Sequence, residues 1–325
     1  MTSSDIMEEW NLTASSVTNF IIAGIPRLQE VKSQTILFAT LLLIYALTFT
    51  ENIIFIIVIT FDHALHSPMY LFICNVAFLD LLIPSVTIPE MYYLITEDSS
   101  IAFGPCITQM ALYLCFLGTE SLMLVAMAYD RYQAICNPLL YPTAMTTKHA
   151  FMLSAFCWTI GSVRTVPHIY LVLTAPFCGP NRIEYFCCDY VSIILLACAE
   201  MSLQIMYDQI VSIIIVLAEL FLIACSYVKI IAAVFRINSA EGRKKAFSTC
   251  ASHLLVISVF YLVIAFVLIS YSMPEFSEQV RSLAAVVQNI FPPLVSPIIY
   301  CLKTKEIRNS IRKLIKKWKA GVLCL

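Results

Sequence analysis

The sequence predicts an all-α membrane protein, a seven-transmembrane helix bundle with a short amphipathic cytoplasmic helix. Hydrophobic residues make up 60% of the 325 positions and charged residues only 13%, about half the charged fraction of a soluble domain. Only seven glycines occur, and the long apolar runs lack the period-two alternation of a lipid-facing barrel. The composition therefore favours helices that cross a bilayer.

Seven segments have the roughly 20 mainly apolar residues that a helix needs to cross the hydrocarbon core. The predicted spans are 36–61, 69–95, 102–130, 150–173, 204–235, 246–272 and 282–302. They divide the chain into an amino-terminal tail (1–35), a helix domain (36–302) and a carboxyl-terminal segment (303–325). No repeat relates the first three spans to the later ones, as an inverted repeat does in many transporters.

The basic residues indicate the orientation of these spans. With the amino terminus outside, the cytoplasmic pieces contain 15 lysines and arginines and the extracellular pieces contain 4, which satisfies the positive-inside rule. The tail lacks the apolar segment of a cleavable signal peptide, so we expect the first span to act as the insertion signal. The glycosylation sequon at Asn11 falls on the predicted outer tail, where it would be modified.

The segment after the last span predicts an amphipathic helix. Its apolar residues recur at helical spacing opposite a basic face, and they are Ile307, Ile311, Leu314, Ile315 and Trp318. Such a helix lies on the anionic inner leaflet of the membrane. The alternative is a disordered basic tail.

The third span carries polar groups along one stripe. Tyr113 and Arg131 are separated by 18 positions, which is about five helical turns and roughly 27 Å of rise. Glu120 lies between them on nearly the same face, with Leu117 and Leu124. Because these polar groups are costly in lipid, the stripe is expected to face the bundle. One rigid helix then connects an outer pocket with the inner surface.

Asp130 and Arg131 at the inner end of this span are the candidates for a switch. We expect Arg131 to pair with Asp130 at rest and to contact an intracellular partner once the helices move; the alternative is an arginine that snorkels to the interface. This arrangement points to signalling. The five histidines are scattered and no HExxH motif occurs, which argues against an enzyme. A single switch motif below an apolar pocket argues against a transporter or channel.

Two carboxylates, Asp80 and Glu120, fall near the middle of the membrane. Two facing anions cannot both stay ionised there without a cation or a proton between them. We therefore expect a Na⁺ or proton site, and the alternative is a permanently protonated, hydrogen-bonded pair. Glu51 and Glu219 also lie within spans, but the side that each faces is not evident from the sequence.

Four motifs resemble those of odorant receptors, which are rhodopsin-like, or class A, G-protein-coupled receptors. The motifs are 65–72 (LHSPMYLF), 127–141 (MAYDRYQAICNPLLY), 245–254 (KAFSTCASHL) and 293–300 (PLVSPIIY). The first and third are specific to odorant receptors among seven-helix receptors, and the similarity covers about residues 20 to 315. Two departures are Glu51 before Asn52, which hints at a fish-type member, and Ser296 before Pro297, where the superfamily usually has asparagine.

The resemblance implies a function and a ligand site. A small odorant would bind among the outer halves of spans three, five, six and seven, and a stimulatory, olfactory-type G protein would then raise cyclic AMP. The matching positions are Tyr113, Leu114, Leu117, Gly118, Val211, Ile215, Tyr261, Ile264, Leu268 and Asn289. The alternative is a class A receptor for an endogenous small ligand outside olfaction.

The polar residues near this site leave the ligand class open. No acid stands at Tyr113, where amine receptors carry an aspartate, so a cationic amine is disfavoured there. Arg164 and His168 are candidates to attract an anion, whereas Asp208 is the nearby acid that would hold a cation. Tyr261 matches the toggle position of the sixth helix, with simple core packing as the alternative.

The resemblance also assigns residues to the inner and central parts of the bundle. The implied switch and G-protein-coupling residues are Asp130, Arg131, Tyr132, Tyr227, Lys245 and Tyr300. Asp80 matches the sodium-site aspartate of the superfamily. With Glu120, and with Asn52 and Ser121 nearby, it would hold Na⁺ as an inactive-state allosteric ion.

Cysteines on the predicted outer side favour disulfides. They are Cys106, Cys178, Cys187, Cys188 and Cys198, and no CxxC or histidine-rich zinc pattern accompanies them. The resemblance implies bridges from Cys106 to Cys188 and from Cys178 to Cys198. Either Cys187 or Cys188 would reach Cys106, so the sequence leaves that choice open.

Overall fold

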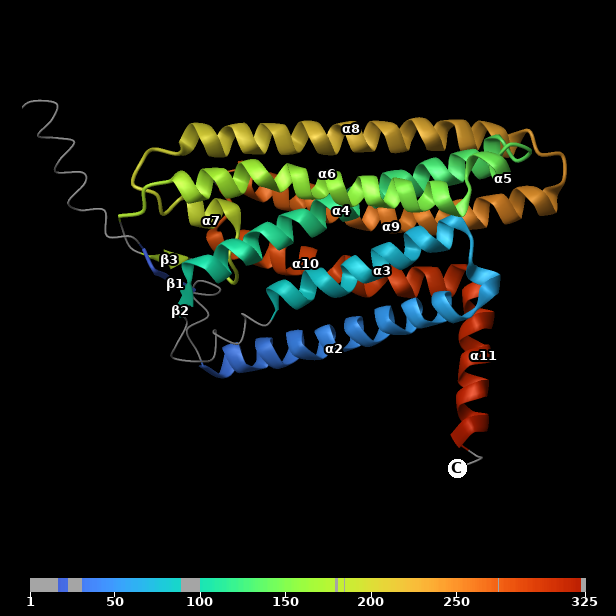
Figure 1. The fold of residues 1–325 in the computed structure, drawn as a ribbon, viewed down its shortest axis with the longest axis horizontal. Helices are drawn as coiled ribbons and strands as arrows, with labels where there is room; N and C mark the ends of the chain where they lie inside the picture. The colour runs from blue at the N-terminus through green and yellow to red at the C-terminus, as the bar shows by residue number, and fades with distance from the viewer. Residues whose placement is uncertain are drawn as a thin grey trace, which may run out of the picture.

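The computed structural model describes residues 17–22, 31–88, 100–178, 181–183, 185–273 and 275–322. Long helices run side by side as one elongated bundle, with three short strands gathered at one end and the last helix turning away at the other (Figure 1). The end with the strands is called the outer end and the end with the last helix the inner end, after the orientation that the basic residues predict. The predicted glycosylation site Asn11 and residues 89–95 of the predicted second span lie outside the described residues.

The bundle is built from seven long helices. They are α2 (Val31–Phe61), α3 (Pro68–Thr87), α4 (Phe103–Cys136), α6 (Thr147–Thr174), α8 (Ser202–Phe235), α9 (Ala240–Ser272) and α10 (Glu278–Lys303). The shorter elements are β1 (Asn19–Ile22), η1 (His63–Leu65), β2 (Ser100–Ala102), α5 (Tyr141–Ala144), β3 (Arg182–Ile183), α7 (Tyr190–Ile194) and α11 (Lys305–Val322).

Within the described residues, six of the long helices are long and apolar enough to cross a membrane. The helix outside this group is α6, whose outer half carries Arg164, Pro167 and His168. These residues lower its mean hydropathy, yet α6 packs along α4 inside the bundle. Its polar groups therefore reflect what it contributes to the interior, and the seven-helix bundle that the sequence predicts is the observed architecture.

The helix ends follow from local sequence. Pro68 occupies the first turn of α3, where its missing N–H costs nothing. Thr146 accepts a hydrogen bond from the backbone N–H of His149 at 3.2 Å and so caps α6, and Ser277 caps α10 in the same way. Such side chains satisfy donors that the first turn of a helix leaves unpaired.

Helix α4 is the centre of the bundle, because it contacts α3, α6, α8 and α9. The closest approach is to α6 at Gly161, where an added Cβ would meet the Thr119 side chain and lie 2.9 Å from the Cys115 carbonyl oxygen. Small residues commonly permit such contacts between membrane helices. Large apolar side chains on the outward faces, such as Phe156 and Phe221, are exposed, as expected of residues that contact lipid.

The three strands form a small sheet in the order β2-β1-β3 at the outer end of the bundle (Figure 1). β1 pairs antiparallel with β2 and parallel with β3. Phe20 and Ile183 of this sheet are fully buried against the start of α4 and the loop before α8. The sheet therefore covers the outer end of the core.

Helix α11 leaves the direction of the bundle at its inner end (Figure 1). Asp62, which follows α2, accepts hydrogen bonds from the Ser310 hydroxyl at 2.6 Å and from Lys313 Nζ at 3.4 Å. The Ser310 bond, the Ala64 backbone N–H and the Lys313 charge lower the pKa of Asp62. Ile307 is buried and Ile311 packs on the core, whereas the Trp318 side chain lies outside the described residues.

The observed helices extend beyond several predicted spans. α2 begins at Val31, inside the predicted 1–35 tail, and α4 continues to Cys136, beyond the predicted end at 130. α9 begins at Ala240, six residues before the predicted 246. The spans were assigned from apolar residues alone, and helices continue into the polar interface where their backbone hydrogen bonds are still made.

Candidate functional site

An outer cavity of about 230 Å³ lies among α4, α6, α8, α9, α10 and the loop that precedes α8. Its lining residues include Tyr113, Leu114, Leu117, Gly118, Arg164, His168, Asp189, Asp208, Val216, Glu219, Ile264, Leu268, Tyr271 and Gln288. Most of the wall is apolar, with a few polar groups converging on it. This combination is characteristic of small-molecule sites.

Six of the ten expected ligand-binding residues line this cavity: Tyr113, Leu114, Leu117, Gly118, Ile264 and Leu268. The other four lie outside its lining, and they are Val211, Ile215, Tyr261 and Asn289. On α8 the cavity is lined by Ser212 and Val216, each one position further along the chain than the expected Val211 and Ile215, and also by Glu219. One position is a rotation of about 100° on a helix.

A polar cluster in the wall of the cavity joins four helices. Glu219 of α8 is buried; its Oε1 accepts from Ser121 of α4 at 3.1 Å and from Arg164 Nη1 of α6 at 3.4 Å. Its Oε2 accepts from the Tyr261 hydroxyl of α9 at 3.1 Å. The face on which Glu219 lies is not evident from the sequence, and Ser121 is expected there beside Asp80. In the structure both residues belong to this cluster.

A second polar pair lies nearer the outer surface. His168 Nε2 of α6 is 2.7 Å from Asp208 Oδ1 of α8, and the imidazole stacks edge-on against Tyr190 at 4.7 Å between ring centroids. Asp208, the acid that was a candidate to hold a cation, is therefore already partnered by His168. Both residues line the cavity.

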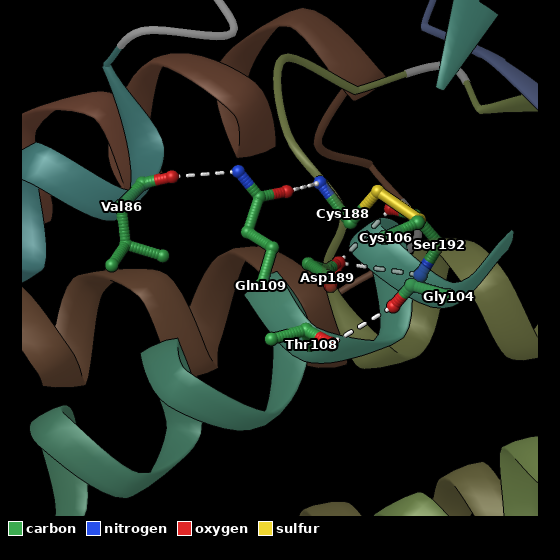
Figure 2. The surroundings of a disulfide bond; sticks show 8 residues. All are labelled: Val86, Gly104, Cys106, Thr108, Gln109, Cys188, Asp189 and Ser192. Carbon is green, nitrogen blue, oxygen red and sulfur yellow. Dashed lines mark hydrogen bonds between the residues drawn. A yellow bond between two sulfur atoms is a disulfide. The ribbon is translucent and has the colours of Figure 1, made fainter. Parts of the chain in front are cut away.

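Two disulfides fix the loop that covers the cavity. Cys106 at the start of α4 is joined to Cys188, and Cys178 is joined to Cys198; these are the two pairings that the resemblance implies. Figure 2 shows Gln109 between the end of α3 and the loop. Its Nε2 donates to the Val86 carbonyl and its Oε1 accepts from the Cys188 backbone N–H, each at 2.7 Å. This buried amide holds the end of α3 and the loop at one distance.

Asp189 continues the same loop into α7. Its carboxylate accepts from the backbone N–H groups of Val191 and Ser192 at 3.2 Å and from the Ser192 hydroxyl at 2.9 Å, so it caps α7 (Figure 2). Burial raises the pKa of Asp189 to about 6, against the opposing effect of these hydrogen bonds. The group is therefore an anion at neutral pH and titrates in mildly acidic conditions.

At the inner end of α4, Asp130 is fully buried and has two partners. Arg131 forms an ion pair with it, with Nε 2.9 Å from Oδ2, and the Tyr141 hydroxyl of α5 donates to Oδ1 at 2.8 Å. Burial and the Asp130 charge raise the pKa of Tyr141, so the phenol keeps its proton. Within the described residues, Asp130 is therefore held by an ion pair and by a hydrogen bond from Tyr141, a contact that the sequence alone does not reveal.

An inner cavity of about 520 Å³ lies between α8 and α9, and of the remaining expected switch residues Tyr227 lines it. The Tyr132 ring lies 5.3 Å from Lys229 Nζ, and Tyr300 packs against His253 at 5.6 Å between ring centroids. The wall is apolar, with Arg243 and Lys244 at its margin. The side chain of Lys245 lies outside the described residues.

Asp80 and Glu120 are both buried and interact electrostatically. Asp80 Oδ1 and Asn52 Oδ1 are buried acceptors without a hydrogen-bond partner among the described residues, whereas Asn52 Nδ2 donates to the carbonyls of Thr48 and Pro293 at 3.0 and 3.1 Å. Buried acceptors are normally satisfied. Oxygen acceptors are also the ligands that a hard cation takes, so this donor set fits a cation. In the part of the chain that the structure describes, no three or more histidine, cysteine or acidic side chains are placed together so that they could hold a metal ion.

The sequence is similar to those of known receptors. The family model described as "Olfactory receptor" matches residues 41–317. Human olfactory receptor 6N1 is 40% identical over 304 residues, 93% of this chain and 96% of that protein. Human olfactory receptor 2A12 is 38% identical over 286 residues, 87% and 91% of the two chains.

The fold matches that of a solved receptor. The crystal structure of squid rhodopsin superposes with a TM-score of 0.68 at 16% identity, covering 88% of this chain and 86% of the other. At that identity the likeness shows the seven-helix fold alone. The match to the family model, together with relatives that are receptors and not enzymes, shows that this multi-pass membrane protein belongs to the olfactory receptor family.

Proposed function

We propose that the chain is an odorant receptor whose outer cavity binds a small organic molecule and whose inner face then activates a stimulatory heterotrimeric G protein, raising cyclic AMP. The observation that carries this proposal is the path of α4. Tyr113 and Leu117 of α4 line the outer cavity, and Asp130 and Arg131 of the same helix form an ion pair at its inner end, here called the latch. One rigid element therefore touches both sites.

The inner cavity between α8 and α9 supports the coupling step. It has an apolar wall of Ile230, Val234 and Cys250 with Arg243 at its margin, which suits an amphipathic helix of a partner that carries acidic residues. In this mechanism the Asp130–Arg131 pair keeps the guanidinium away from the partner at rest. When α9 moves, Arg131 becomes available to the partner.

The orientation follows from the same proposal. The amino terminus and a glycosylated Asn11 would be extracellular, and α11 would lie on the cytoplasmic leaflet of the plasma membrane. The support is the excess of lysine and arginine on the α11 side.

The centre of the bundle is proposed to hold Na⁺, or a shared proton, at Asp80 and Glu120 in the inactive state. The buried acceptors of Asp80 and Asn52 that lack partners support an ion or a proton there. Inhibition of signalling by Na⁺ should therefore be lost in Asp80→Asn. Inhibition that survives this substitution would exclude a sodium site at Asp80.

The test of the proposed function is cyclic AMP accumulation in cells that lack the stimulatory α subunit and in the same cells after its restoration. The panel contains volatile organics, amino acids, bile acids and prostaglandins, and Arg131→Ala is the comparison variant. We expect a ligand response that needs both the restored subunit and Arg131, at equal surface expression. A response without the α subunit would exclude the proposed coupling, and a response to bile acids or prostaglandins alone would favour a receptor for an endogenous ligand.

A further inference from the structure

Among the described residues, most of the hydrogen-bonding capacity of the Arg164 guanidinium in the outer cavity is unused. A guanidinium has five N–H donors. Within the described residues, that of Arg164 makes one hydrogen bond, to Glu219 at 3.4 Å, which is longer than usual for N–H···O. Its side chain remains 32% exposed and lines the cavity. Donors are therefore available to a bound molecule.

This guanidinium lies against the facing helix. Gly161 lets α6 approach α4 closely, and a Cβ at Gly118 of α4 would be in ordinary contact with the guanidinium, 3.6 Å from Arg164 Nη1. Gly118 itself lines the cavity. The charged group is thus held against α4, beside the apolar wall formed by Leu114 and Leu117.

The three carboxylates of the lining, in contrast, already have partners. Both oxygens of Glu219 accept hydrogen bonds, from Ser121 and Arg164 at one and from Tyr261 at the other. Asp208 Oδ1 lies 2.7 Å from His168 Nε2, and Asp189 accepts three hydrogen bonds from its own loop. A ligand that brings an acceptor can take up the unused donors of Arg164 without disturbing any of these contacts.

The charges of the lining decide between a neutral and an anionic acceptor. Three carboxylates, of Glu219, Asp208 and Asp189, face one arginine and one histidine. A carboxylate ligand would add a further negative charge to a partly desolvated space, which is unfavourable without a matching cation. A carbonyl oxygen takes up the free N–H groups without this cost, and the remaining apolar lining suits a hydrocarbon body.

We propose that Arg164 is the hydrogen-bond anchor of the outer cavity and selects small, neutral ligands that carry a carbonyl oxygen on an apolar body. Aldehydes, ketones and esters fit this chemistry. A carboxylate of the same skeleton would add an unmatched negative charge, and an amine would place a second cation beside Arg164 and leave its donors unused. This assignment rests on the proposed ligand-binding function and adds the ligand class and the residue that determines it. The sequence leaves open whether the ligand is an anion or a cation, and this assignment replaces both with a neutral ligand.

The test uses ligand sets that share a skeleton and differ in the head group, such as octanal, methyl octanoate, octanoic acid, octylamine and octane, with shorter and longer analogues of each. Thermal stabilisation of the purified full-length receptor measures binding, and cyclic AMP in cells measures signalling. We expect the neutral carbonyl compounds to be the strongest ligands in both assays. Preference for the acids or amines, or no stabilisation by any carbonyl compound, would overturn the proposal.

Variants separate the anchor from a structural role. The double variant Arg164→Met with Glu219→Gln removes the guanidinium donors without leaving a buried carboxylate unpaired. We expect it to lower the affinity for carbonyl ligands by roughly tenfold or more. Binding of the hydrocarbon should be unchanged. Lys148→Met, at the exposed inner end of the same helix, is the matched control and should change neither. Equal loss for carbonyl and hydrocarbon ligands would contradict an anchoring role for Arg164.

The two readouts also distinguish failure of the anchor from failure of the receptor function. Stabilisation by carbonyl compounds without a cyclic AMP response would leave the anchor intact and exclude the proposed coupling. A cyclic AMP response to acids or amines but not to carbonyl compounds would support the receptor function and exclude the anchor.

Discussion

Gly161 shows how a single residue determines the spacing of two helices. An added methyl group would lie 2.9 Å from the Cys115 carbonyl oxygen and 3.1 Å from the Thr119 backbone nitrogen. These are backbone atoms of α4, so they cannot rotate away as a side-chain end would. The contact therefore transmits any added volume at residue 161 directly to the α4–α6 interface, which carries the outer cavity.

Gly161→Ala should lower the stability of the protein by about 1–3 kcal/mol, the usual cost of overpacking, and reduce surface expression. Gly118→Ala is the matched control on the facing helix, because its Cβ would be 3.6 Å from the nearest atom, an ordinary contact. Flow cytometry of tagged receptors and thermal unfolding of the purified protein measure the two effects. Equal behaviour of the two variants would show that the helices separate more readily than the packing implies.

Asp189 provides a pH-dependent prediction at the same scale. Its pKa in the folded protein is raised from 3.8 to about 6, so folding favours the protonated form. The stability that this group contributes is largest below pH 3.8 and falls as the pH rises through 6. Asp189→Asn does not titrate, so we expect its melting temperature relative to the native protein to rise between pH 4 and pH 7.

Thermal unfolding in detergent across that pH range measures this difference. Asp189→Ala is the control: it does not titrate either, so its difference from the native protein should change with pH in the same way, but it should be less stable than Asp189→Asn by about 1 kcal/mol because it removes the cap on α7. A difference between Asp189→Asn and the native protein that does not vary with pH would contradict a raised pKa.

Among the elements, α9 is linked to the rest of the cavity by the hydrogen bond from Tyr261 to Glu219. This bond joins α9 to α8, and through Arg164 and Ser121 to α6 and α4. The Asp130–Arg131 ion pair is formed in the same structure. We propose that the hydroxyl of Tyr261 belongs to the set of contacts that hold α9 in a resting arrangement.

Tyr261→Phe removes that hydroxyl and preserves the ring. We expect higher basal cyclic AMP at unchanged surface expression, because α9 loses one of its ties to the resting bundle. Tyr170→Phe, on the exposed side of α6, removes the same group where it faces outward and should have no effect. Basal cyclic AMP that stays at the native level would assign Tyr261 to packing alone.

The sequence predicts the position of each helix better than the face that it turns toward the cavity. The spans can be located from the sequence because apolar runs of this length have few other uses, and Tyr113, Glu120 and Arg131 mark one face of α4. On α8 the polar residues Asp208, Ser212 and Glu219 recur at helical spacing, and they mark the face that lines the cavity. The resemblance points instead to Val211 and Ile215, one position earlier, so this polar spacing is the signal that locates Ser212 and Val216.

Pairings between elements were the other information that the sequence did not supply. Arg164 and Glu219 are 55 positions apart, and Asp130 and Tyr141 are 11 apart across a loop. Each partner was visible as a polar residue in or near a span. Their contact depends on the rotation of whole helices, which side-chain type does not encode.

For the whole molecule, the proposed orientation makes a simple prediction. An epitope tag at the amino terminus should be accessible to antibody on intact cells, and a tag after residue 325 only after permeabilisation. Treatment with a glycosidase should increase the gel mobility of the native protein, and Asn11→Gln should abolish this shift. An accessible carboxyl-terminal tag on intact cells would contradict the orientation that the basic residues indicate.

We propose that the Asp130–Arg131 latch controls access of a stimulatory G protein to the inner face. The most direct test is the rate of GDP release from the purified G protein in the presence of receptor in nanodiscs. Asp130→Asn should accelerate release above the native rate, because it frees Arg131 from its ion pair. Adding Arg131→Ala to that variant should return release to the rate without receptor. An Asp130→Asn rate equal to the native rate, or a double variant as active as the single one, would contradict the latch.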